Sequence, residues 1–205
     1  LKLLFTKPYL LGIFGSLAFF EIIVTIFDFN FKYEAGSVYS KVELTSYFAT
    51  YSSVVNIVSF LFLIFGVNKI TRRLGITVSL AIVPVAFGLA VLGFTMLNSL
   101  QFLFCLMVGS KAINYALNGP SLKQLYVPTS PAAKSKAQAW IETFGSRGAK
   151  EIGSGINMLP NVIGRSAYKL VGSGIGMVFV VIWLGVSIYL GRTYTKAVNS
   201  HKDVC

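Results

Sequence analysis

Six segments of the chain are each about as long as the apolar core of a membrane is thick, and they constrain the fold more than any other feature. They cover residues of about 9–31, 46–67, 76–97, 102–118, 136–159 and 169–191. A membrane-spanning helix needs roughly 20 mostly apolar residues. The chain is 55% hydrophobic and only 12% charged, whereas an ordinary soluble domain carries about 25% charged residues. We therefore predict an all-α membrane protein in which residues 1–205 form one domain, a six-transmembrane-helix bundle.

The segment 136–159 differs from the other five because it carries several charges. Its charged residues include Arg147 and Lys150, which share a face at helical spacing, and Glu151, which lies four residues after Arg147 and can pair with it. Its many glycine and alanine residues would let neighbouring helices approach closely. Charges inside a membrane usually mark a substrate or ion pathway. A cytoplasmic amphipathic helix with a solvated charged face is the alternative interpretation.

The first predicted helix also carries a polar stripe. Glu21, Thr25, Asp28 and Lys32 follow the spacing of one helix face. Asp28 and Lys32 lie towards the end of the segment, where a position at the membrane interface, with a snorkelling lysine, would explain them without a function. Glu21 lies nearer the middle of the segment, where that explanation does not hold.

Lys111, in the fourth predicted helix, shares a face with Asn114 and Asn118. An intramembrane lysine indicates a functional or pairing role. Cations in a dry groove bind anions through charge-assisted hydrogen bonds, and neighbouring acids keep the empty site neutral or take up a proton. The charged residues at membrane depth therefore predict a binding site for an anionic substrate, formed by Glu21, Lys111, Arg147, Lys150 and Glu151. A structural ion pair between Arg147 and Glu151 would have the same pattern.

The sequence also argues against several function classes. It contains no Ser/His/Asp set, no Walker loop and no cluster of metal ligands, so we predict no enzyme, no catalytic residue, no metal and no cofactor. The single histidine, His201, and the two cysteines, Cys105 and Cys205, form no metal-binding or disulfide pattern. The net charge of +11 is spread over few charged residues, which argues against a nucleic-acid partner. The chain begins at Leu1 without a signal peptide, so we expect a segment of a longer chain or an incomplete gene product.

The distribution of lysine and arginine predicts an orientation. With six crossings, one side of the membrane receives Lys2, Lys7, Lys69, Arg72, Arg73, Lys123, Lys134, Lys136, Arg192, Lys196 and Lys202. The other side receives Lys32, Lys41, Arg165 and Lys169. Because cytoplasmic loops carry the excess of positive residues, we predict a multi-pass protein of the cytoplasmic (inner) membrane with both termini of this segment in the cytoplasm.

Several motifs combine into a resemblance to a known family. They are Asn114-Tyr-Ala-Leu-Asn-Gly-Pro120, Leu125-Tyr-Val-Pro128, Lys134-Ser-Lys136 and Gly145-Ser-Arg-Gly-Ala-Lys150. They resemble the Tyr-Ala-Leu-x-x-Pro, Tyr-Ile-Pro-like, Lys-x-Lys and Gly-Ser-Arg-x-x-Lys segments of the bacterial and plastid ATP/ADP translocases, the non-mitochondrial nucleotide transporters. The similarity covers nearly the whole chain as the C-terminal half. Asn118-Gly119 replaces the family's Phe-Asp, and Leu122-Lys123-Gln124 replaces its Lys-Glu-Met, as in a divergent branch.

The resemblance implies half of a twelve-helix carrier similar to the major facilitator superfamily, with two six-helix halves around a central site. The implied function is nucleotide transport, as ATP/ADP exchange or related nucleotide uptake, by alternating access. Arg147 and Lys150 become candidate phosphate ligands and Glu21 a candidate transport carboxylate, whereas Lys111 is supported by the residue pattern alone. The implied partners are a nucleotide or other organic anion, the lipid bilayer, and an N-terminal six-helix half or a second subunit. The alternatives are a proton-coupled carrier of another organic anion and a non-transporting membrane scaffold.

Overall fold

The computed structural model describes residues 6–65, 67–96, 99–200 and 204, and in these ranges it contains helices and no strand. The α-helices are α2 (Pro8–Val38), α3 (Lys41–Phe65), α4 (Val67–Met96), α5 (Leu100–Ile113), α6 (Gly119–Gln124), α7 (Pro131–Trp140), α8 (Ser146–Ile156), α9 (Pro160–Ile163) and α10 (Arg165–Ser200). Two π-helical turns, η1 (Asn114–Asn118) and η2 (Ile141–Gly145), join α5 to α6 and α7 to α8. The prediction of an all-α bundle is confirmed.

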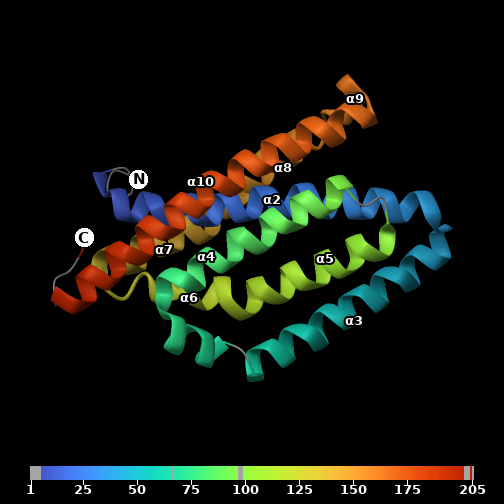
Figure 1. Ribbon diagram of the computed structural model, residues 1–205. Coiled ribbons are helices and arrows are strands. Elements are labelled where there is room, and N and C mark those ends of the chain that lie inside the picture. The colour runs from blue at the N-terminus through green and yellow to red at the C-terminus, as the bar shows by residue number, and fades with distance from the viewer. Residues whose placement is uncertain (1–5, 66, 97–98, 201–203, 205) are drawn as a thin grey trace.

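Five helical stretches among the described residues are long and apolar enough to cross a membrane. They are Pro8–Val38, Lys41–Ile64, Arg73–Gly93, Leu100–Gln124 and Val171–Ser200. The remaining long helix, formed by α7, η2 and α8, carries too many charges to join this set. It nevertheless packs along α2 and leads from the end of the bundle near α6 towards the end near α9 (Figure 1). The chain is thus a multi-pass membrane protein in which one long helix is polar.

Three of the connections between the predicted helices are more helical than expected. The polar stretch expected as a loop over residues 33–45 is almost entirely helical, because α2 continues to Val38 and α3 begins at Lys41. At the start of α3, the Glu43 carboxylate accepts hydrogen bonds from the Ser40 backbone N–H at 2.9 Å and from the Ser40 hydroxyl at 2.7 Å, and the first of these is one half of a capping box. The basic turn expected over residues 68–75 is helical as well, and the chain changes direction at its last residue, Gly75.

Gly75 divides α4 into two helices, because its backbone has a φ of 78° and a ψ of 167°. Only glycine adopts a positive φ without steric cost. The stretch expected as a loop over residues 119–135 is also partly helical. There α6 continues the fourth helix to Gln124, and α7 begins at Pro131, whose fixed φ suits the first position of a helix.

Helix α2 lies at the centre of the bundle, in contact with α3, α5, α8, η2 and α10 (Figure 1). The largest apolar cluster fills the space between α2, α3, α4, α5 and α10, with Phe31, Phe87 and Trp183 among its most buried members. The Trp183 indole N–H donates a 2.8 Å hydrogen bond to the Ser16 hydroxyl, which joins α10 to α2. Helix α2 is therefore held by neighbours on several sides.

Small residues bring α8 close to α2, as the composition of this segment predicts. A Cβ atom added at Gly153 would lie 2.8 Å from the Thr25 Cβ, and one at Gly145 would lie 2.9 Å from the Phe14 ring. Gly148 and Gly155 have nothing within 4 Å of an added Cβ. The close approach is therefore confirmed at two of these glycines, and the other two lie on the face of α8 that points away from α2.

Candidate functional site

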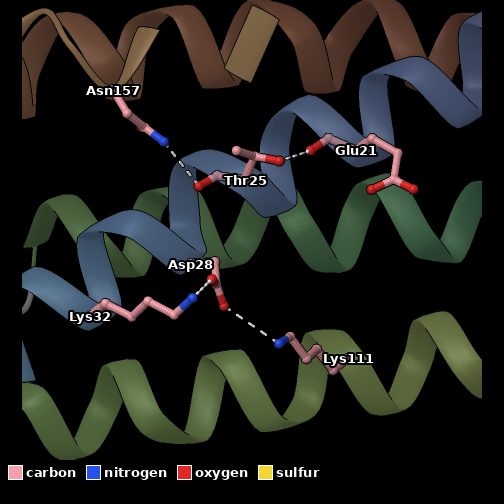
Figure 2. A network of polar contacts seen from close by, with 6 residues as sticks. All are labelled: Glu21, Thr25, Asp28, Lys32, Lys111 and Asn157. Atoms are coloured by element: carbon pink, nitrogen blue, oxygen red, sulfur yellow. Dashed lines mark hydrogen bonds and ion pairs between the residues drawn. The ribbon is translucent and has the colours of Figure 1, made fainter. Parts of the chain in front are cut away.

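The polar stripe predicted for the first helix lies on α2 and meets two different helices. Glu21 contacts α8, and Asp28, two turns later, contacts α5. Figure 2 shows Glu21, Thr25, Asp28 and Lys32 along α2, with Lys111 approaching Asp28 from α5. Seven residues of helix correspond to about 10 Å along its axis. The stripe therefore carries two separate charged contacts, one with α8 and one with α5.

The first contact joins Glu21 to α8. The Ser146 hydroxyl donates a 2.7 Å hydrogen bond to Glu21 Oε1, and Lys150 Nζ lies 3.7 Å from Glu21 Oε2. The Glu21 side chain is 17% exposed and that of Lys150 is 55% exposed. Ser146 and Lys150 are one helical turn apart, so both side chains reach the same carboxylate. The structure thus brings together two predicted site residues and adds Ser146, which lies inside the Gly-Ser-Arg motif.

The second contact joins Asp28 to α5. Lys111 Nζ lies 3.4 Å from Asp28 Oδ1, and Lys32 forms an ion pair with Asp28 Oδ2. Lys111 Nζ also lies 5.3 Å from the centre of the Tyr51 ring, within the range of a cation–π interaction. The side chains of Asp28 and Lys111 are 26% and 29% exposed. The sequence left Asp28 open between an interfacial and a functional position, and the structure makes it the partner of Lys111.

Arg147 and Glu151 do not form the predicted ion pair. Both side chains are exposed on α8, and no ion pair connects them in the part of the chain that the structure describes. A spacing of four residues permits such a pair, but an exposed pair contributes only about 0.3–0.5 kcal/mol, which does not outweigh the entropy of two long free side chains. The predicted pairing of Glu151 with Arg147 is therefore wrong, and the acid that contacts a lysine of α8 is Glu21.

A hydrogen-bonded network holds the end of α8 and the start of α10 against α2. The Asn157 amide donates a 3.1 Å hydrogen bond to the Thr25 carbonyl (Figure 2), and the Tyr168 hydroxyl donates to Asn157 Oδ1 at 3.0 Å. Asn30 donates to the Ile26 carbonyl at 2.8 Å and to the Tyr168 hydroxyl at 3.4 Å. No sequence motif indicated these residues, because their roles depend on segments that only the fold brings together.

Both lysine-bearing helices change to a π-helical turn beside these contacts. In the fourth helix η1 begins three residues after Lys111, and in the fifth helix η2 ends directly before Ser146. Single π-helical turns within α-helices frequently lie at functional sites. Within the described residues, no group of three or more His, Cys, Asp or Glu side chains could hold a metal ion.

The chemistry of the site is that of paired charges. Three lysines face two carboxylates on the polar stripe of α2, which leaves one surplus positive charge. Because these groups lie in an apolar bundle, a lysine released from its carboxylate would attract an anion more strongly than it would in water. The arrangement is therefore suited to anion binding.

Comparison with curated proteins finds distant relatives among nucleotide carriers. The chain is 25% identical over 222 residues to ADP,ATP carrier protein 2 of Chlamydia trachomatis, an alignment that covers 94% of this chain and 40% of that protein. It is 24% identical over 218 residues to ADP,ATP carrier protein 2 of Chlamydia pneumoniae, which covers 93% of this chain and 40% of that protein. It is 23% identical over 206 residues to ADP,ATP carrier protein 4 of Rickettsia conorii, which covers 88% and 40%.

The chain therefore spans about two-fifths of the length of the curated relatives it matches. No model of a protein family matches it, and no solved structure matches it. The similarity therefore supports a distant relationship to ADP,ATP carriers over most of the chain, in agreement with the resemblance of the sequence motifs.

Proposed function

We propose that this chain forms one six-helix half of a membrane carrier for nucleotides, which acts by alternating access as an ATP/ADP exchanger or a related uptake system. The observation that carries the proposal is the pair of carboxylate–lysine contacts, Glu21 with Lys150 and Asp28 with Lys111, on one face of α2. Charged groups inside a membrane are costly and usually serve a transport pathway. The distant similarity to ADP,ATP carriers supports a nucleotide as the anion.

In this proposal the cations of α8 bind the phosphates of the substrate. Lys150 is more than half exposed although it is paired, so a ligand can reach it. Arg147 is exposed three residues earlier on α8, where its guanidinium can reach the same anion and bind it bidentately. Glu151 is exposed without an ion pair among the described residues, so its role would be limited to tuning the charge near Arg147.

Glu21 holds Lys150 in place while the site is empty. When a phosphate of the substrate replaces Glu21 as the partner of Lys150, Lys150 moves to the substrate. Glu21 then keeps the hydrogen bond from Ser146. A half-buried carboxylate that lost every partner would be strongly destabilising. The hydrogen bond from Ser146 therefore lowers the free-energy cost of moving Lys150 away from Glu21. A proton-coupled carrier of another organic anion is the second candidate, because Glu21 is the less exposed carboxylate of the two contacts and acids inside a membrane often belong to proton relays.

The remaining half of the carrier would be an N-terminal six-helix half or a second subunit. We propose that the protein lies in the cytoplasmic membrane with the ends near Pro8 and Ser200 on the cytoplasmic side. Figure 1 has these ends at the same end of the bundle, as an even number of crossings requires.

The proposal is tested by Lys150→Gln in the complete gene product, reconstituted in liposomes and assayed by exchange of radiolabelled ATP against ADP. Loss of one charge-assisted contact typically costs about 1.5–3 kcal/mol, or roughly tenfold to a hundredfold in affinity. We expect a loss of this size in Lys150→Gln with an unchanged melting temperature. Lys123→Gln, an exposed lysine on α6, is the matched control and should retain wild-type exchange. Wild-type exchange in Lys150→Gln would remove the phosphate-binding role, and loss of folding together with exchange would favour the scaffold alternative.

A further inference from the structure

The contact between α2 and α5 contains one carboxylate and two lysines. One carboxylate oxygen of Asp28 forms an ion pair with Lys111 of α5, and the other forms an ion pair with Lys32 of α2 itself. The surplus positive charge of the polar stripe therefore lies here, since Glu21 and Lys150 balance each other. The Lys111 side chain is 29% exposed and that of Lys32 is 60% exposed, so the bundle encloses neither lysine completely.

We propose that this contact is a second anion subsite, at which Lys111 is handed from Asp28 to a phosphate or carboxylate group of the substrate. Lys32 stays on Asp28 during this exchange. The inference rests on the proposed function, because it assumes that the substrate is an anion carried by this bundle. It assigns Asp28 and Lys32 as positioning residues that set the availability of Lys111 without touching the ligand.

The shared carboxylate explains why two lysines are present. If Asp28 had Lys111 as its sole partner, an anion that captured Lys111 would leave a half-buried carboxylate unpaired, which is strongly unfavourable. Lys32 removes this penalty because it is already in place one turn along α2. The arrangement parallels the first contact, where Ser146 keeps Glu21 paired when Lys150 moves.

Tyr51 supplies a second indication that the subsite is incomplete. Its ring lies beside Lys111, and its hydroxyl is buried without a hydrogen-bond partner among the described residues. Buried polar groups are nearly always paired, so in this proposal the hydroxyl gains a partner when Lys111 moves away from Asp28. Because Glu21 and Asp28 are about 10 Å apart along α2, the two subsites would contact different parts of an extended anionic ligand.

The test is equilibrium binding of radiolabelled ATP to the purified complete gene product. We expect Lys111→Gln to weaken binding at least about tenfold, through loss of a charged contact. Lys32→Gln should also weaken binding, by about tenfold, because Asp28 then retains Lys111. Asp28→Asn should bind ATP at least as tightly as the wild type, because it frees Lys111. The double variant Asp28→Asn/Lys32→Gln should have the same ATP affinity as Asp28→Asn, since it has no carboxylate that could be left without a partner.

These signs separate a positioning role from a structural one. A merely structural Asp28–Lys111 pair predicts weaker binding in Asp28→Asn and no rescue of Lys32→Gln by Asp28→Asn. Wild-type affinity in Lys32→Gln, or weaker binding in a folded Asp28→Asn, overturns the inference. If Asp28→Asn does not fold, the test is a comparison of ATP affinity between Lys32→Gln and the conservative variant Lys32→Arg. Lys32→Arg should have wild-type affinity, because the arginine keeps Asp28 paired.

The same assay distinguishes failure of this inference from failure of the proposed function. Lys196→Gln, an exposed lysine on α10, is the matched control and should bind ATP as the wild type does. If the wild type binds ATP and Lys150→Gln weakens it while Lys32→Gln does not, the nucleotide site stands and the second subsite is refuted. If the wild type binds no ATP, the proposed function itself is refuted.

Discussion

At the scale of single residues, both acids of the polar stripe on α2 have two partners each. Glu21 has Lys150 and Ser146, and Asp28 has Lys111 and Lys32. A carboxylate with one partner in an apolar bundle would hold that partner too firmly for a ligand to compete. A carboxylate with two can release one of them to a ligand. This difference separates a binding site from a helix-pairing ion pair, and it can be measured.

Ser146→Ala tests this property at Glu21. The variant leaves the ion pair with Lys150 intact but removes the 2.7 Å hydrogen bond that would remain after Lys150 moves. Because a hydrogen bond to a charged group contributes about 1.5–3 kcal/mol, we expect ATP affinity to fall by about tenfold or more. Ser154→Ala, at an exposed serine on the same helix, is the control and should bind ATP normally. Equal affinities in the two variants would show that Glu21 does not need a second partner.

Sequence patterns predicted the charged residues of the candidate site but not their pairing. The spacing of Glu21 and Asp28 on one helix face could be read directly, and so could the intramembrane position of Lys111. The partner of each acid lies on another helix, and no periodicity within one helix specifies which helices meet. The error at Arg147 and Glu151 has the same origin, because a spacing of four residues allows a local pair while the fold provides α8 with a different acid.

At the scale of helices, α8 positions the cations and depends on its small residues to reach α2. The added Cβ at Gly153 would also lie 3.1 Å from the Ile22 carbonyl oxygen, a backbone atom that cannot easily move. The distance of Lys150 from Glu21 therefore depends on the absence of a side chain at Gly153, on the side of α8 that faces α2.

Gly153→Ala should destabilise the protein. Overpacking of a close contact typically costs about 1–3 kcal/mol, which exceeds the gain of about 1 kcal/mol that alanine brings to a helix interior. Gly155→Ala on the same helix meets no atom within 4 Å, so it should be neutral or stabilising. Thermal unfolding of the two variants in detergent measures the difference. An equal rise in melting temperature in both would show that α8 and α2 are farther apart than the structure has them.

The helices are longer than the apolar segments that predicted them, for reasons that the sequence partly contains. The Glu43 carboxylate pairs the Ser40 backbone N–H at the start of α3, and the connection between α2 and α3 is two residues rather than a long loop. The break at Gly75 was less predictable, because a basic stretch ending in glycine suits a turn as well as a short helix. Polarity was a poor guide here, because a helix can continue beyond the apolar part of its sequence.

At the scale of the whole molecule, the number of crossings depends on the helix formed by α7, η2 and α8. Its composition excludes it from the apolar set, yet its η2 and α8 parts pack against α2 (Figure 1). Six crossings give a strong excess of lysine and arginine on one side. Five crossings would place the loops before and after this helix on the same side of the membrane.

Cysteine labelling decides between these topologies. In a background without the native cysteines, single cysteines at Val127 and Val162, exposed positions before α7 and within α9, report on the two ends of the charged helix. Exposed Leu74 and Val38 serve as cytoplasmic and external references. With six crossings, a membrane-impermeant maleimide added to intact cells should label the cysteines at Val162 and Val38, and inverted vesicles should expose those at Val127 and Leu74. Labelling at Val127 and Val162 from the same side would mean that the charged helix does not cross. The charged helix would then lie outside the apolar core, and Lys150 would not act at membrane depth.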